Sequence, residues 1–270
     1  MSDDRDRPSV QIFANTEAAL ARMRETAEMA ECRLVSALSV DVPDPAARAA
    51  PDAAILIELD DEAASDAVAS LLDWLQQEAA QRGRRGVVSA PAALIDLVAA
   101  STGHAGIEHL CEADEAERLA AVARAVARTP PRLRDDGTGA RVLQRSQDYA
   151  PAPAGPADLE LIRAMLRARR LRDAHFPADL FADPAWDILL DLLAARLERK
   201  QVTVSSLCVA AAVPPTTALR WIALLGERGL LVRAVDSTDR RRAFVHLSET
   251  AARALGGWLR QARRLATEAL

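Results

Sequence analysis

The sequence predicts two domains of different class, an α/β domain followed by a mainly helical domain. Short apolar runs alternate with amphipathic helical segments over residues 9–128, whereas helical periodicity dominates residues 158–270. Residues 129–157 between them are rich in Pro, Gly and Ala and keep no regular period, which is typical of a linker. A chain of 270 residues, half of them hydrophobic, is long enough for two domains with cores of their own.

The first domain is expected to contain a doubly wound parallel sheet. Strand-like runs occupy residues 10–14, 32–40, 53–59, 86–90 and 106–113. Helical patterns occupy residues 15–31, 62–82, 91–101 and 114–128, and Asn15 is a plausible N-cap of the first helix. Strands that alternate with helices imply parallel βαβ units. The uninterrupted apolar run AAILIEL is typical of a parallel strand that is buried on both faces.

The two halves of the chain differ in charge. From residue 158 onward there are 18 Lys and Arg against 13 Asp and Glu, a net of +5. The first 157 residues carry 16 against 26, a net of −10, within an overall formal charge of −5. This asymmetry indicates that the basic half meets a polyanion.

The C-terminal domain has the element order of a winged helix-turn-helix. We expect helices over 158–176 and 185–200, a short helix over 205–212, a second helix over 216–229, strands over 230–235 and 242–248, and a last helix over 249–268 that begins after Ser248. Two helices joined by a tight turn cross steeply, so that the second can lie in a DNA major groove.

The predicted second helix supplies candidate DNA contacts. We expect its first exposed residues to be Pro215, Thr216, Thr217 and Arg220. Leu219, Ile222, Ala223 and Leu225 have the spacing of an inner face. Threonine hydroxyls and a helix N-terminus can bind phosphate, and an arginine at this position can reach a phosphate or a guanine edge.

The tip of the predicted hairpin is also a candidate DNA contact. Arg240, Arg241 and Arg242 stand in a row between the two strands. Arginines at such a tip suit a narrow minor groove, where the negative potential is strongest.

The stretch GLLVRAVDSTDRRRAFVHLSETAARAL resembles the wing and following helix of MarR-type regulators. The resemblance as a whole extends over residues 158–270. The residues that carry the resemblance are Gly229, Asp236, Asp239, Arg240, Arg241, Leu247 and Ser248. The resemblance implies a homodimer formed by the first and last helices of the domain, 158–176 and 249–268. One departure is Pro214–Pro215 at the start of the second helix, where the family more often has small polar residues.

The first domain resembles a response-regulator receiver, which implies a flavodoxin-like fold. The residues that receivers use for phosphorylation are largely missing. Asp60 ends the third strand, where receivers hold the phosphoacceptor, and Ser89 with Ala90 ends the fourth. The acidic pair expected after the first strand is replaced by Ala14–Asn15–Thr16, and the lysine expected after the fifth strand by Cys111–Glu112. Asp60 is therefore interpreted as a vestigial phosphoacceptor, and the domain as a surface for dimerisation or for a protein partner.

The remaining features exclude several classes. The sequence has no Gly-rich phosphate loop and no Ser/His/Asp or Cys/His arrangement, so we expect neither an enzyme nor a cofactor or metal site. Three scattered cysteines, a charged N-terminus and the lack of a long apolar run predict a cytoplasmic protein without a membrane span.

Two alternatives keep the same fold. One is a response regulator controlled by phosphorylation of Asp60, which the missing lysine and acidic pair disfavour. The other is a winged helix that binds protein in place of DNA, which the arginine-rich hairpin tip disfavours.

Overall fold

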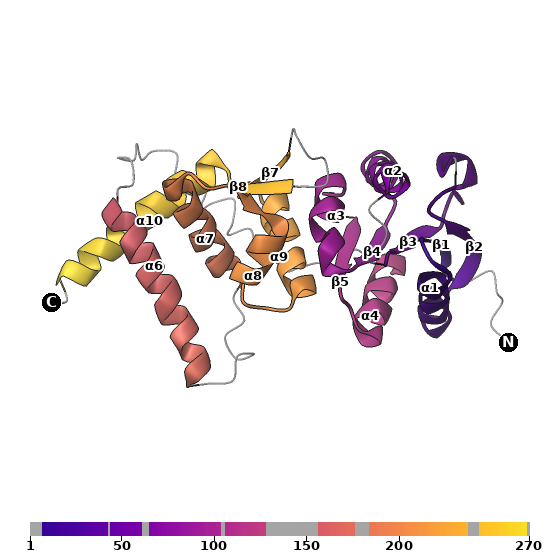
Figure 1. Cartoon of the computed structure of the whole chain (residues 1–270), viewed down its shortest axis with the longest axis horizontal. Coiled ribbons are helices and arrows are strands. Elements are labelled where there is room, and N and C mark those ends of the chain that lie inside the picture. The colour runs from indigo at the N-terminus through magenta and orange to yellow at the C-terminus, as the bar shows by residue number, and fades with distance from the viewer. Residues whose placement is uncertain are drawn as a thin grey trace. The chain divides into compact units, whose positions relative to one another are not determined.

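The computed structural model describes residues 7–42, 44–60, 65–103, 106–127, 156–175, 184–236 and 243–268 (Figure 1). The chain divides into two compact units. One comprises Met1–Pro131, Pro215–Ala223 and Val235–Ala243, and the other comprises Arg132–Pro214, Leu224–Ala234 and Phe244–Leu270. None of the helices in the described ranges is, taken alone, long and apolar enough to cross a membrane.

The first unit contains the predicted five-stranded parallel sheet. Its strands are β1 (Ser9–Ala14), β2 (Arg33–Ser39), β3 (Ala54–Glu58), β4 (Gly86–Ala90) and β5 (Ile107–Cys111). The order across the sheet is β2-β1-β3-β4-β5, and all neighbouring pairs are parallel. This is one of the common doubly wound orders, in which the direction of winding reverses between β1 and β3. The α/β class predicted for this part of the chain is therefore confirmed.

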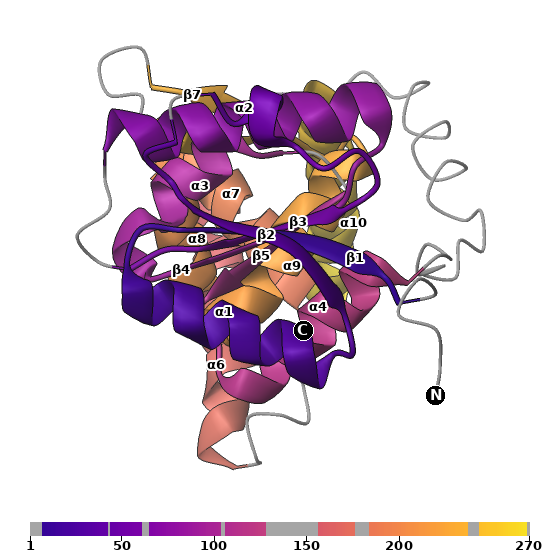
Figure 2. The ribbon, with the colours of Figure 1, turned by 90° about the vertical axis from the view of Figure 1, so that its right-hand side faces the viewer.

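Helices cover both faces of the sheet. They are α1 (Glu17–Met29), α2 (Asp66–Arg82), α3 (Ile95–Ser101) and α4 (Glu115–Val126), with short 3₁₀ turns η1 (Ala46–Arg48) and η2 (Ala92–Leu94). Figure 2 shows α2 and α3 over one face and α1 and α4 over the other. Because helices pack on both faces, the central strands are buried on both sides.

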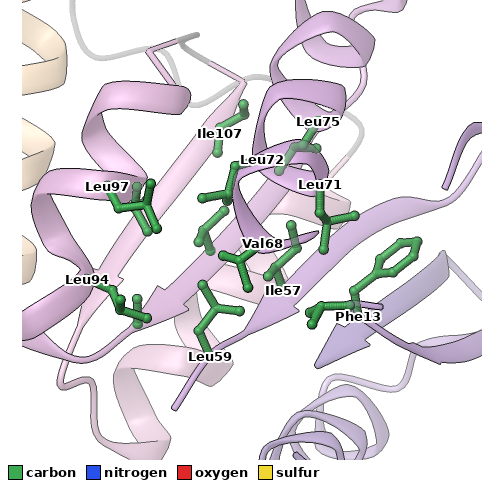
Figure 3. Close-up of a cluster of buried hydrophobic side chains, with 14 of the residues drawn as sticks. Phe13, Ile57, Leu59, Val68, Leu71, Leu72, Leu75, Leu94, Leu97 and Ile107 are labelled. Atoms are coloured by element: carbon green, nitrogen blue, oxygen red, sulfur yellow. The ribbon is translucent and has the colours of Figure 1, made fainter. Parts of the chain in front are cut away.

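Side chains of each strand alternate between the two cores. In β3, Ile55 and Ile57 face the core under α2 and α3, whereas Leu56 faces the core under α1 and α4. Neighbouring Val87 and Val88 in β4 divide in the same way. Figure 3 shows the α2 and α3 side, where residues from these helices close over β1 and β3. An uninterrupted apolar run is what this two-sided burial requires.

Side-chain caps set where the helices begin. The Thr16 hydroxyl accepts a hydrogen bond from the backbone N–H of Ala19 at 3.0 Å and caps α1, so the prediction of Asn15 as the N-cap is wrong by one residue. Ser65 caps α2, which begins four residues later than predicted. Asp114 and Glu117 form a capping box at the start of α4. Each cap satisfies N–H groups that a helix leaves without an internal partner.

The second half of the chain alternates helices with three short strands. Its elements are α6 (Pro156–Leu171), η3 (Arg172–Ala174), α7 (Pro184–Glu198), β6 (Val202–Thr203), α8 (Val204–Ala210), α9 (Pro215–Glu227), β7 (Leu231–Val235), β8 (Ala243–Leu247) and α10 (Glu249–Glu268). The strands form a sheet of order β6-β8-β7, with β6 and β8 antiparallel. Thr203 caps α8, which begins one residue earlier than predicted, while Ser248 caps α10 as predicted.

Truncation of a core leucine tests the α/β core. Leu72 of α2 is fully buried in the cluster of Figure 3. Replacing it by alanine is expected to lower the free energy of unfolding by about 2–5 kcal/mol, because apolar contacts are lost and a cavity remains. Chemical denaturation followed by circular dichroism measures the change. Leu34→Ala on the edge strand β2, where the side chain is 40% exposed, removes the same atoms and should cost less than about 1 kcal/mol. Equal losses in the two variants would contradict the assigned core.

Candidate nucleic-acid interface and the polar cluster at the sheet edge

Asp60 lies two residues beyond the end of β3, at the carboxyl edge of the parallel sheet. The end of β1 lies alongside, because Ala14 pairs with Glu58 in the parallel register. The Asn15 side-chain oxygen accepts a hydrogen bond from the backbone N–H of Asp60 at 3.0 Å. This is the point between β1 and β3 where doubly wound sheets commonly carry their polar sites.

Both carboxylate oxygens of Asp60 are engaged. The Thr16 hydroxyl donates to Oδ2 at 2.6 Å, and the Arg22 guanidinium donates to Oδ1. Partial burial acts to raise the pKa of Asp60, but the hydrogen bonds from Thr16 and Arg22 and the charge of Arg22 outweigh it, so that this pKa is lowered. Asp60 is thus held as an ionised hydrogen-bond acceptor.

Arg22 also reaches Glu58, the last residue of β3. Its Nε lies 3.3 Å from Oε1 of Glu58, and Glu58 as a whole is only 3% exposed. Burial raises the pKa of Glu58, and the Ser89 hydroxyl together with the charges of Arg118 and Arg22 opposes that rise. One guanidinium therefore bridges two carboxylates, which is a geometry that suits its planar set of donors.

The sequence arguments singled out neither Arg22 nor Glu58. A charge inside the apolar run AILIEL was the available signal for Glu58, since a buried carboxylate needs a cationic partner. Nothing local indicated the partner, because Arg22 lies 36 residues earlier in the chain. Glu112 directly follows β5, at the place where a receiver would have its lysine. Its backbone has a positive φ of 49°.

The helix pair α8 and α9 forms the candidate nucleic-acid interface. The break from Ala211 to Pro214 separates them, and their axes differ in direction by 111°. Pro215 is the first residue of α9, where its missing N–H leaves no internal hydrogen bond unmade. Such a steep bend over a short connection is typical of helix-turn-helix pairs.

The side chains of α9 divide into an inner and an outer face. Leu219, Ile222 and Leu225 are buried, as their spacing predicted, and Ala223 is half-buried. Pro215 and Arg220 are exposed and Thr217 is half-buried. Arg220 thus offers a charged group to solvent on the first turns of the helix.

Thr216 differs from its neighbours. Its residue is only 6% exposed, so the expectation that it is exposed is wrong for this structure. Within the first unit, its hydroxyl accepts from the backbone N–H of Cys111 at 3.1 Å and donates to the Cys111 carbonyl oxygen at 3.2 Å. No local pattern indicates this contact, since the two residues are 105 positions apart.

The two strands after α9 show the predicted alternation. In β8, Ala243, Val245 and Leu247 are buried, while Phe244 and His246 are half-buried. Leu230 accepts a hydrogen bond from Ser248 at 2.8 Å and closes the base of this strand pair. Arg240, Arg241 and Arg242 lie outside the described residues, so their contribution stays a prediction from sequence.

The sequence matches no family model and no curated protein.

Loss of the Arg22 charge should raise the pKa of the Asp60 carboxyl group. Arg22→Gln removes the positive charge, so we expect the pKa of Asp60 to rise toward its ordinary value of 3.8. Since the folded pKa is lowered, the stabilisation that Asp60 provides is present above this ordinary value and is lost as the pH falls through the folded pKa. Carboxyl carbon chemical shifts titrated by NMR measure the change. Arg24→Gln, from an exposed position on the same helix, is the control. An unchanged Asp60 titration in Arg22→Gln would show that the ion pair is not formed in solution.

The same pairing predicts resistance to phosphorylation. Attack on a phosphodonor needs a free carboxylate oxygen, and both oxygens of Asp60 are engaged by Thr16 and Arg22. Incubation with a small phosphodonor and Mg²⁺ should therefore leave the mass of the intact protein unchanged. A mass gain of one phosphoryl group that disappears in Asp60→Ala would overturn this expectation.

Proposed function

We propose that the chain is a DNA-binding transcriptional regulator that acts as a homodimer through a winged helix-turn-helix. The receiver-like domain is not phosphorylated and serves dimerisation or contact with a protein partner. The observation that carries the proposal is the succession from α8 to α10: two helices bent by 111° at a short break, two strands in one small sheet, and a long helix. In the proposed docking, α9 enters the major groove, and the tip between β7 and β8 reaches a narrow minor groove.

Charge and exposure support DNA as the partner. Arg220 is exposed near the start of α9, where a guanidinium can reach a phosphate or a guanine edge. The predicted hairpin tip adds Arg240, Arg241 and Arg242, and the whole chain from residue 158 carries a net charge of +5. Positive charge gathered in the half that contains the helix pair favours encounter with a polyanion.

The homodimer rests on the MarR-type resemblance, which assigns the contact between protomers to α6 and α10. Within one chain these helices are tied together, because Arg263 of α10 donates to Asp158 of α6 at 3.0 Å. Trp258 of α10 also packs edge-to-face on Trp186 of α7, with ring centroids 4.6 Å apart. A fixed α6 and α10 pair gives a partner protomer a defined surface to match.

The Arg22 bridge supports a role for the α/β domain without phosphoryl transfer. An internal guanidinium occupies Asp60, where a receiver would need a free carboxylate and a divalent cation. The proposal includes no enzymatic activity, and a regulator of this kind acts in the cytoplasm.

Arg220→Ala tests the interface. Anisotropy titrations with a labelled duplex from the region upstream of the protein's own coding sequence, and with a scrambled duplex, are run over a series of salt concentrations. We expect Arg220→Ala to weaken binding and to reduce the slope of log affinity against log salt by about one, because about one counterion fewer is released. Combined Arg240→Ala and Arg242→Ala should reduce it by about two.

The matched control is Arg24→Ala, which removes the same charge from an exposed position on α1. It should leave the affinity and the salt slope as in the wild type. Unchanged affinity and slope in the Arg220, Arg240 and Arg242 variants would sink the assignment. Failure of the wild type to bind any duplex at low salt would favour a winged helix that binds protein.

A further inference from the structure

The α/β unit contains a hollow at the amino ends of its strands, at the opposite edge of the sheet from Asp60. The hollow has a volume of 760 Å³ and lies between the segments that lead into β1, β3 and β4 and the end of α4. We infer that this arginine hollow, lined by Arg7, Arg82, Arg84 and Arg85, binds a small anion that carries two or more phosphate groups.

Charge is the first support for the inference. Four arginines line the hollow against one acidic residue, Asp52. Glu78, which pairs with Arg82 and Arg84, adds a second carboxylate and leaves two positive charges in excess. This excess stands out because the first 157 residues carry a net charge of −10. A concave cationic site in an acidic domain concentrates anions locally.

The hollow is built from fixed parts. The Arg84 side chain is only 7% exposed, and it donates to the carbonyl oxygens of Ala50 at 2.7 Å and Pro51 at 3.1 Å. From the other side, the amide of the buried Gln11 donates to the Arg48 carbonyl at 2.8 Å and accepts from Ala50 at 3.0 Å. The loop that carries Pro51 and Asp52 is therefore held before any ligand arrives, which lowers the entropy lost on binding.

In the described residues, the Arg85 guanidinium donates to neutral backbone carbonyl groups and not to a carboxylate. One of its terminal nitrogens donates to the carbonyl oxygens of Ala127 and Arg124 at the end of α4. These bonds hold the guanidinium in place at a helix C-terminus, where a cation is favourable. A guanidinium has five N–H donors, and those two bonds come from a single nitrogen. Among the described contacts, the other N–H groups of Arg85 therefore remain available to donate to a ligand oxygen.

The dimensions favour a small ligand. A volume of 760 Å³ lies in the range of about 300–1,000 Å³ that is usual for small-molecule sites. Guanidinium groups match phosphate oxygens in pairs, and four arginines are among the residues that line the hollow. Pro8, Pro51 and Val126 add apolar surface that can cover an uncharged part of the ligand. A nucleic-acid strand would need a groove that follows its backbone through successive phosphates.

Isothermal titration calorimetry with inorganic pyrophosphate, on the full chain at constant ionic strength, tests the site. The wild type should show saturable binding of one pyrophosphate per chain. Arg7→Gln combined with Arg82→Gln should weaken it by about tenfold or more, because hydrogen bonds to a charged ligand are lost. These two arginines are chosen because Arg84 and Arg85 hold backbone segments in place and their loss could disturb the fold.

The matched control combines Arg24→Gln with Arg48→Gln, which removes the same two charges from exposed positions outside the hollow. It should bind pyrophosphate as the wild type does, and so should Arg220→Ala. Absence of saturable binding by the wild type would overturn the inference, and so would equal weakening in the test and control pairs. Loss of binding in Arg220→Ala would place the anion at α9 and would also overturn it, without bearing on the proposed DNA contact.

Discussion

The burial of both faces of the parallel sheet is the constraint on which the rest of the α/β unit depends. Central residues such as Ile55, Leu56 and Val87 meet helices on either side and are fully buried. A polar side chain in the middle of such a strand would need a partner within the core. Polar groups therefore gather where strands begin and end, with the Arg22 bridge at the carboxyl edge and the arginine hollow at the amino edge.

Two of the buried polar residues in the central strands show how such groups are accommodated. Gln11 of β1 uses its amide to hold the loop before β3, and Glu58 at the end of β3 is paired with Arg22. In each case the buried side chain has a polar partner outside the apolar core: backbone groups of Arg48 and Ala50 for Gln11, and the Arg22 guanidinium for Glu58. Arginine supplies the cation at both edges, in a chain whose only lysine is Lys200. A guanidinium keeps its charge over the whole physiological range and can bridge two acceptors, which a lysine does less well.

Much of the α/β domain could be predicted from sequence because two-sided burial leaves a strong local signal. The run AAILIEL located β3 within a residue at each end. The order of the strands could not be predicted, since pairing depends on which helices pack over which face. Asn15 and Thr16 are both good caps, and the choice between them depended on the N–H of Asp60, 45 residues away from Asn15. Local patterns carry no information about such distant partners.

The candidate sites were harder to predict for the same reason. The inner face of α9 followed from helical spacing, because Leu219, Ile222 and Leu225 repeat at that period. The exposure of Thr216 did not follow, since a contact with Cys111 decides it. The arginine hollow draws on four separate segments of the chain, and no one of them is unusual alone. Arginine spacing in the sequence could not show that these segments meet.

In the proposed regulator, the two edges of the sheet would give the α/β domain a signalling role without phosphoryl transfer. At the carboxyl edge, Arg22 fills the place of an exchangeable cation with a covalently attached one, so that neither metal nor phosphoryl group has a free carboxylate at Asp60 to bind. At the amino edge, the inferred site takes a diffusible anion and is partly walled by Ala127, the residue after the end of α4. The sequence continues from there into the predicted linker that leads to the proposed DNA-binding half. In the inferred site, an anion bound by Arg85 would share its guanidinium with the carbonyl oxygens of Arg124 and Ala127, and would change how firmly the end of α4 is held.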